Sequence, residues 1–259
     1  MKTFDPDYPI ILGLCGKAGT GKTSVAEYIV PNYSVKFTPQ ATWDHLFFAM
    51  PLYEMASIKR GTLGDLRADR VAYRIHDTLL DLFGASPMFG APKYDELVTL
   101  VKDIATAPIP MDDEIKPRDF LQQTGIACRA IKETCFAEWA VKKVYSRMNT
   151  LQDAQVEDLP FIGIISDVRF VNEAEAIAKQ PNGLVIKFEA SEKVREKRLF
   201  ERDGHHMTEE QKNHISERVE LIDPANIYSV IDTDNLTIQE QAKIVEQTVL
   251  EYAGAMLNA

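Results

Sequence analysis

Residues 16–23, GKAGTGKT, constrain the fold of this chain more than any other segment of its sequence. They match G-x-x-x-x-G-K-[ST] at every fixed position, directly after the apolar run IILGLC and before a segment of helical period. Glycines let the backbone turn tightly enough for its N–H groups to face phosphate oxygens. The pattern therefore predicts a buried strand, a phosphate-binding loop and a helix, in that order.

The residue types in this loop fit a nucleoside triphosphate. The helix that begins near Gly21 would point the positive end of its dipole at the phosphates. Lys22 would reach the β- and γ-phosphates, and the Thr23 hydroxyl would bind Mg²⁺. We therefore expect ATP to contact Gly16, Lys17, Ala18, Gly19, Thr20, Gly21, Lys22, Thr23 and Ser24.

Short apolar runs alternate with longer segments of helical period, which favours a parallel sheet covered by helices. The predicted fold is α/β, of the P-loop NTPase type, with a five-stranded parallel sheet flanked by helices. Strands are expected at 10–15, 161–166, 184–188 and 228–231, with a weaker candidate at 34–38. Helices are expected at 22–30, 66–82, 117–132, 135–148, 171–180, 192–202 and 237–253.

The sequence predicts one kinase-like domain with two additions. Its core would span about 10–56 and 116–253. The turn-rich runs GASPMFGAP and TAPIPMDDE indicate a helical insertion at about 57–115, and a lid is expected at about 192–217.

Composition excludes several classes of function. The chain has 259 residues and a formal net charge of −10, which argues against a sequence-independent binder of nucleic acid polymers. A local group of arginines can still bind a small anion. The sequence has no apolar stretch of membrane-spanning length and no hydrophobic signal core at its start, so a cytoplasmic protein is expected. The three cysteines lack metal-type spacing and are expected to be buried free thiols.

The segment FIGIISDVRFVNEAEAI, residues 161–177, places charged residues after a predicted strand. Asp167 should emerge at the carboxyl end of that strand, where ligands of open α/β sheets bind, and an acidic residue there can hold Mg²⁺. Arg169 and Glu173 follow within one helical turn. The alternative is a helix cap at Asp167 with a surface ion pair between Arg169 and Glu173.

A second group of cations lies on one predicted helix. Arg195, Arg198 and Arg202 are spaced by three and four, which puts them on one face. Arginines on a closing lid could stabilise a transferred phosphoryl group and exclude water, whereas the alternative is a solvated charged face. His205, His206 and His214 lack a ligand spacing that indicates a metal site.

Several of these segments together resemble one family. The glycine-rich loop, PRDFLQQTGIACR, Trp139, SDVRFVNEAEAI and HISE are similar to the phage-type deoxynucleoside monophosphate kinases, a branch of the P-loop nucleoside monophosphate kinases. The resemblance runs from about residue 10 to residue 249 and is thin between 57 and 115. It implies MgATP as phosphoryl donor, a deoxynucleotide as acceptor and a host-cytoplasm location for a phage-encoded enzyme. Family members often form dimers, so a homodimer is one candidate assembly, and no surface pattern in the sequence proves it.

The same resemblance assigns roles to residues. It implies that Asp167, Arg169 and Glu173 line the monophosphate pocket and that Arg195, Arg198 and Arg202 act as lid arginines. Trp139 would stack on a base or, alternatively, be an ordinary core tryptophan. The remaining implied contacts are to the acceptor from Arg118, Gln122 and Gly125, and to the ATP base from Asp232 and Asn235, where a simple polar turn is the alternative.

Two segments depart from the family pattern. Met50 and Pro51 stand where relatives commonly carry an acidic residue, which puts an acceptor contact there in doubt. Ile126 stands where relatives often have a hydroxyl residue, so the preference for a base could shift.

The expected activity is in-line transfer of the γ-phosphoryl group of ATP to a (deoxy)nucleoside 5′-monophosphate. The catalytic candidates are Lys22, Arg169, Arg195, Arg198 and Arg202. Two alternatives remain: a small-metabolite kinase similar to dephospho-CoA kinase, and an ATP-binding switch without catalysis.

Overall fold

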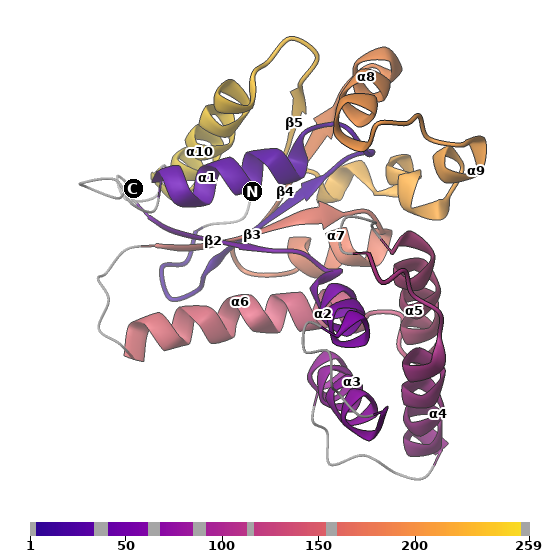
Figure 1. Cartoon of the computed structure of the whole chain (residues 1–259). Helices are drawn as coiled ribbons and strands as arrows, with labels where there is room; N and C mark the ends of the chain where they lie inside the picture. Colours follow the sequence, from indigo (N-terminus) through magenta and orange to yellow (C-terminus); the bar gives the residue numbers. More distant parts are fainter. Residues whose placement is uncertain are drawn as a thin grey trace. The chain divides into compact units, whose positions relative to one another are not determined.

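The computed structural model describes residues 4–33, 41–61, 68–84, 92–112, 117–153 and 160–254 (Figure 1). Two compact units make up the chain: unit 1 comprises Met1–Phe47 and Ala140–Ala259, and unit 2 comprises Phe48–Trp139. The expected insertion at 57–115 falls within unit 2, which extends further on both sides. The weaker strand candidate at 34–38 lies outside the described residues.

Unit 1 contains a parallel sheet of five strands in the order β2-β3-β1-β4-β5. The strands are β1 (Ile10–Cys15), β2 (Thr42–Leu46), β3 (Phe161–Val168), β4 (Gly183–Glu189) and β5 (Ser229–Asp232). The predicted fold class is confirmed, and the four firm strand predictions each coincide with an observed strand to within two residues. The strand before the glycine-rich loop, β1, is the central one.

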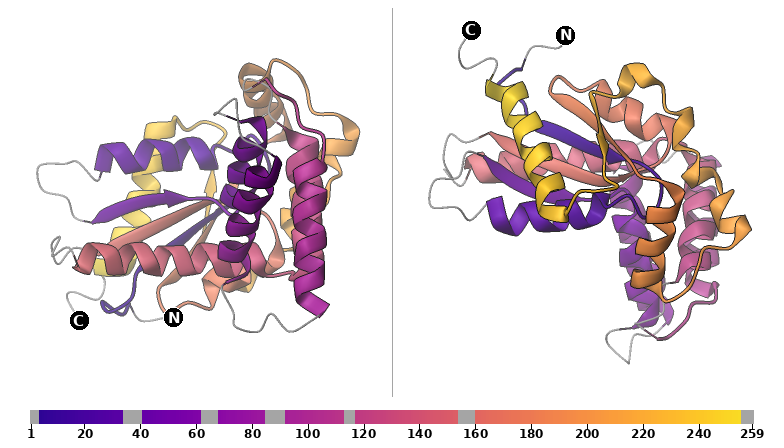
Figure 2. Two further views of the ribbon diagram at one scale, coloured as in Figure 1. Left: turned by 60° about the horizontal axis from the view of Figure 1, so that its bottom comes forward. Right: turned by 90° about the horizontal axis from the view of Figure 1, so that it is seen from above.

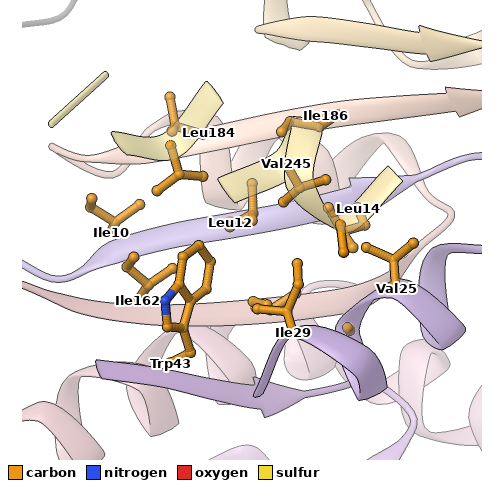
Figure 3. Packing of buried hydrophobic residues seen from close by; sticks show 14 of the residues in the cluster. Ile10, Leu12, Leu14, Val25, Ile29, Trp43, Ile162, Leu184, Ile186 and Val245 are labelled. Carbon is orange, nitrogen blue, oxygen red and sulfur yellow. The ribbon is translucent and has the colours of Figure 1, made fainter. Parts of the chain in front are cut away.

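One face of the sheet is covered by α1 (Lys22–Tyr33) and α10 (Ile238–Gly254) (Figures 1 and 2). Alternate residues of β1 point to this face, where Leu12 and Leu14 pack with Val25, Ile29 and residues of α10 (Figure 3). These side chains are fully buried. The core therefore fixes the start of α1, and with it the loop between β1 and α1.

The opposite face packs against α6 (Cys135–Asp153) and α7 (Val171–Ala178). Glycines on this face allow a close approach of the helices. A Cβ atom at Gly13 would lie 2.7 Å from Ile177 Cδ1 of α7, and one at Gly163 would lie 2.7 Å from Val144 of α6. The apolar runs of β1 and β3 are thus buried on both faces, as central strands of a parallel sheet must be.

The edge strand β2 was not expected, because its sequence TWDHL contains two polar residues in a row. The structure gives each of them a partner. Asp44 pairs with Arg147 of α6, and His45 Nε2 lies 2.7 Å from Ser166 Oγ of the neighbouring strand. Such an edge strand has no apolar run for sequence reasoning to detect.

After β4 the chain of unit 1 continues through short helices. They are α8 (Glu192–Asp203), α9 (Glu209–Lys212) and the 3₁₀ turns η1 (Ile215–Glu217), η2 (Val219–Leu221) and η3 (Pro224–Asn226). Ser191 caps the start of α8, and Gly204 in the left-handed region ends it. The predicted helix at 192–202 is confirmed.

Unit 2 is helical in its described residues. It comprises α2 (Met50–Arg60), α3 (Ala68–Phe83), α4 (Pro92–Thr106), α5 (Arg118–Ile131) and the first residues of α6. Met55, Ile75, Leu79 and Leu100 are among its buried side chains. Sequence reasoning predicted α3 and α5 and did not place α2 or α4.

Candidate functional site

The glycine-rich loop is held in a conformation that its glycines alone allow. Gly16 has φ 144° and Gly19 has φ 81°, both outside the range that other residues adopt readily. A Cβ atom at Gly19 would lie 2.8 Å from the carbonyl oxygen of Arg195, and one at Gly16 would collide with the carbonyl oxygen of Phe188. The loop is therefore seated between the end of β4 and the first turns of α8.

Lys22 is buried with its ammonium group inside this loop. Its Nζ donates to the carbonyl oxygens of Gly16 at 2.6 Å and Lys17 at 2.9 Å. Burial, and after it repulsion from Arg169, lowers the pKa of Lys22 to about 7, even though the negative charge of Glu217 acts in the opposite direction. A buried cation whose charged form is short of counter-charge is well suited to an anionic ligand.

The other end of the loop is fixed from β5. Thr233 follows that strand and is fully buried. Its hydroxyl group lies within hydrogen-bond distance of two carbonyl oxygens to which it can donate, that of Thr20 at 3.2 Å and that of Glu189 at 3.1 Å. Thr23 and Ser24 lie in the first turn of α1 and are exposed. The loop thus sits over the carboxyl ends of the central strands, where the sequence predicts it.

The end of β3 brings a second cation to the loop. Asp167 is half-buried at this strand end, and the backbone N–H groups of Arg169 and Phe170 donate to Glu173 Oε2 at 2.9 and 3.1 Å. The guanidinium of Arg169 donates to Glu217 Oε1 at 2.7 Å. Glu173 therefore shapes the turn into α7, while Arg169 faces the loop side.

Glu217 joins these parts, and sequence reasoning gave it no chemical role. Its carboxylate is 6% exposed and accepts from Arg169 with one oxygen and from the backbone N–H of Ala18, at 2.8 Å, with the other. The one signal available in the sequence was its position at the end of HISE. Its partner in the loop lies 199 residues earlier, a separation that local patterns do not report.

The three arginines of α8 have three different surroundings. Arg195 Nη1 donates to the carbonyl oxygen of Ala18 at 3.3 Å, so this residue contacts the loop. Arg198 donates to Thr233, at 3.0 Å to its hydroxyl and 2.6 Å to its carbonyl oxygen. Arg202 is exposed and pairs with Asp203. One helix face carries all three, as predicted, but only the first of the three reaches the loop.

The segment after β5 forms a polar turn, one of the two structures expected for it. Asp232 Oδ1 accepts from the backbone N–H of Asp234 at 3.0 Å, and Asn235 is exposed. Asp234 in turn accepts from the backbone N–H of Ser191 at 2.7 Å, which ties the turn to the start of α8. A contact of this turn with the ATP base stays a prediction.

The remaining candidates belong to unit 2. Arg118 begins α5, Gln122 is exposed one turn later, and Gly125 is buried, where a Cβ atom would lie 3.3 Å from Leu52 Cδ1. Trp139 is buried, and its indole N–H donates to Asp81 at 2.7 Å. That environment is the one expected of a core tryptophan. The roles of these residues toward an acceptor stay predictions.

The site in unit 1 fits a triphosphate. It combines the buried ammonium of Lys22, the guanidinium groups of Arg169 and Arg195, and a backbone N–H that already donates to a carboxylate. Magnesium bound to nucleotide phosphates needs only one or two protein oxygens. Thr23, which is exposed, and Asp167, which is half-buried, carry a hydroxyl and a carboxylate that could supply these oxygens.

Comparison with known proteins gives one distant sequence relative. No family model matches the chain. Deoxynucleoside-5′-monophosphate kinase of Escherichia phage T5 is 27% identical over 180 residues, which cover 65% of this chain and 71% of that enzyme. This similarity supports a nucleotide kinase in general.

The chain also matches several solved structures. For the crystal structure of TT1252 from Thermus thermophilus, the match covers 94% of this chain and 97% of the TT1252 chain, with 16% sequence identity and a TM-score of 0.41.

Within the part of the chain that the structure describes, no helix has the length and apolar character needed to cross a bilayer.

Proposed function

We propose that the chain is an ATP-dependent kinase of (deoxy)nucleoside 5′-monophosphates. The observation that carries the proposal is the convergence of Lys22, Arg169 and Arg195 on one glycine-rich loop at the carboxyl edge of a parallel sheet. The distant similarity to the phage T5 enzyme supports the choice of acceptor.

The proposed reaction has a simple balance of bonds. An oxygen of the acceptor's 5′-phosphate attacks the γ-phosphorus of ATP, and a new P–O bond forms. The bond between the γ-phosphorus and the β–γ bridging oxygen breaks, and ADP leaves with its electron pair. The attacking oxygen is already anionic, so rate acceleration comes from positioning and from neutralising charge.

The residues of the site divide this work. Lys22 and the loop N–H groups hold the donor phosphates. Arg169 holds the acceptor phosphate in line with them, and Arg195 places its positive charge beside the loop. Bound Mg²⁺ supplies neutralisation of the phosphate charge, with Thr23 and Asp167 as the residues that hold it.

A panel of acceptors with MgATP tests the proposal. Each acceptor is tested separately, and the panel includes deoxynucleoside monophosphates, ribonucleoside monophosphates and dephospho-CoA. We expect ADP to form with one or more of the deoxynucleoside monophosphates. The Lys22→Ala variant should lose at least about 100-fold in turnover, because it removes charge stabilisation from the transferred group. The matched control is Lys179→Ala, which removes an exposed lysine paired with Glu175 on α7.

Each other outcome has a distinct meaning. Phosphorylation of dephospho-CoA alone would replace the proposed acceptor with a small metabolite. ATP binding without transfer to any member of the panel would favour a nucleotide-binding switch. Full turnover by a folded Lys22→Ala variant would contradict the assignment of the donor site.

A further inference from the structure

Glu217 is a buried carboxylate placed where a phosphate group would find the same partners. Its two oxygens accept from an N–H of the glycine-rich loop and from the guanidinium of Arg169, at 2.8 and 2.7 Å. It also lies near the ammonium of Lys22, whose pKa it raises. A phosphate oxygen bound by this loop would seek the same N–H group and the ammonium of Lys22.

The two anions cannot use the Ala18 N–H together at full strength. A backbone N–H carries one hydrogen, and a hydrogen bond shared between two acceptors is weaker than one made to a single acceptor. A carboxylate and a phosphate oxygen brought against the same group also repel each other, and burial makes that repulsion strong. Binding of a triphosphate therefore favours departure of the carboxylate from the loop.

The element that carries Glu217 can move it without disturbing the sheet. Glu217 ends η1, a turn of three residues, and η2 follows directly after it. Neither turn is part of the strand ladder; Ile215 and Leu221 on them are exposed, whereas Val219 of η2 is buried. A small displacement of this segment would take the carboxylate off the loop and release Arg169 at the same time.

We propose that Glu217 is an internal stand-in for a donor phosphate, held by the loop and Arg169 in the free protein and exchanged for the phosphates of ATP on binding. This inference rests on the proposed function and adds to it which group of the chain competes with the donor for the loop. Because Arg169 is released by the same exchange, the donor would make this arginine available to the acceptor.

A neutral replacement separates this role from a merely structural one. In Glu217→Gln the side chain keeps its size but loses the charge that competes with phosphate. We expect its affinity for ATP, measured by calorimetry without acceptor, to be roughly three- to tenfold higher than that of the unmodified protein. A structural role alone predicts unchanged or weaker binding.

The matched control is Glu220→Gln. Glu220 lies on η2, is exposed, and faces Lys17 of the same loop at 3.7 Å, so its replacement removes an equal charge nearby. Solvent screens an exposed pair, and the affinity should change by no more than about twofold. An equal gain in both variants would show a general charge effect and overturn the exchange.

A measurement on the unmodified protein covers the case in which Glu217→Gln does not fold. On addition of ATP, amide hydrogen exchange should slow in peptides from the loop and become faster in peptides from residues 214–221. Slower or unchanged exchange in 214–221 would overturn the proposal, since the carboxylate would then have stayed in place.

The proposed function can be judged from the same titrations. If the unmodified protein binds ATP, Lys22→Ala does not, and Glu217→Gln binds no more tightly, the donor site stands and the exchange is wrong. If the unmodified protein binds no ATP, the proposed function is contradicted, and the exchange with it.

Discussion

Single residues at the site are held by partners that lie far away in the sequence. The ammonium of Lys22 is short of counter-charge, the guanidinium of Arg169 depends on Glu217, and the orientation of Glu217 depends on Ala18. Burial makes each of these contacts strong and makes an unpaired member costly. A single substitution here is therefore expected to affect ligand binding as well as stability.

The position and the tight turn of the loop could be predicted from sequence because the motif is contiguous and its glycines fall at fixed places in it, while the roles of its residues toward ATP stay predictions. The contacts of the three arginines on α8 could not be predicted from the sequence. Periodicity places Arg195, Arg198 and Arg202 on one face, but whether each meets the loop, Thr233 or Asp203 depends on which strand ends lie beneath the helix. That arrangement is decided by the sheet order.

His45 provides a residue-scale prediction about pH. Burial lowers its pKa below the ordinary value, Asp44 partly opposes this, and Arg147 adds to it. The unfolded chain therefore binds more protons than the folded chain as pH falls through 6.5, and this group makes folding less favourable there. In His45→Gln the contribution is absent, while a polar group that can reach Ser166 remains.

We expect the unfolding free energy of the unmodified protein to fall relative to that of His45→Gln between pH 7 and pH 5. Urea unfolding of both proteins at the two pH values measures this difference. Other titrating groups are shared and cancel in the comparison. Parallel pH dependence of the two proteins would show that His45 titrates in the folded state as it does when unfolded.

At the scale of elements, the close packing of the glycine-rich loop against α8 can be tested by substituting two glycines. Gly19 and Gly204 both have positive φ, 81° and 73°. A Cβ atom at Gly19 would meet the backbone of α8, whereas one at Gly204 would have no heavy atom within 4 Å. Comparing alanine at the two positions isolates the steric contact from the backbone strain that they share.

Gly204→Ala should cost about 1 kcal/mol in unfolding free energy, and Gly19→Ala roughly 2–4 kcal/mol, because close packing adds to the strain. Chemical denaturation measures both values. The Gly19 variant should also bind ATP more weakly, since either the loop or α8 must shift. Equal costs for the two substitutions would mean that α8 does not press on the loop.

Elements differ in how well the sequence predicts them. The strand β1 and the helix α1 are marked by a buried apolar run and a motif, and both begin where expected. The strand β2 has neither signal, because its order comes from partners on α6 and β3. The helices α2 and α4 pack within unit 2, so tertiary contacts decide them more than local preference does.

For the whole molecule, the three cysteines distinguish the two units. Cys15 lies in unit 1, and Cys128 and Cys135 lie in unit 2; all three are free and buried. Burial raises their pKa values to about 11, about 12 and about 11. Reaction with a thiol reagent therefore requires opening of the unit that holds each cysteine.

We expect ATP at 100 times its dissociation constant to slow the labelling of Cys15 by about 100-fold, because the proposed donor site belongs to unit 1. Labelling of Cys128 and Cys135 should slow much less if unit 2 opens separately. Mass spectrometry of labelled peptides measures the three rates in one sample. Equal protection of all three cysteines would show that the units open together.

The order of the strands has a consequence for synthesis of the chain. The glycine-rich motif is made before residue 25, but the strands on either side of β1 lie beyond residue 160, and the partner of Ala18 is residue 217. At about 5–20 residues per second, the ribosome needs roughly 10 to 40 seconds to cover the distance from the motif to Glu217. Throughout that interval the nascent chain carries the complete motif without these partners, so we expect the proposed donor site to form only after residue 217 has been translated.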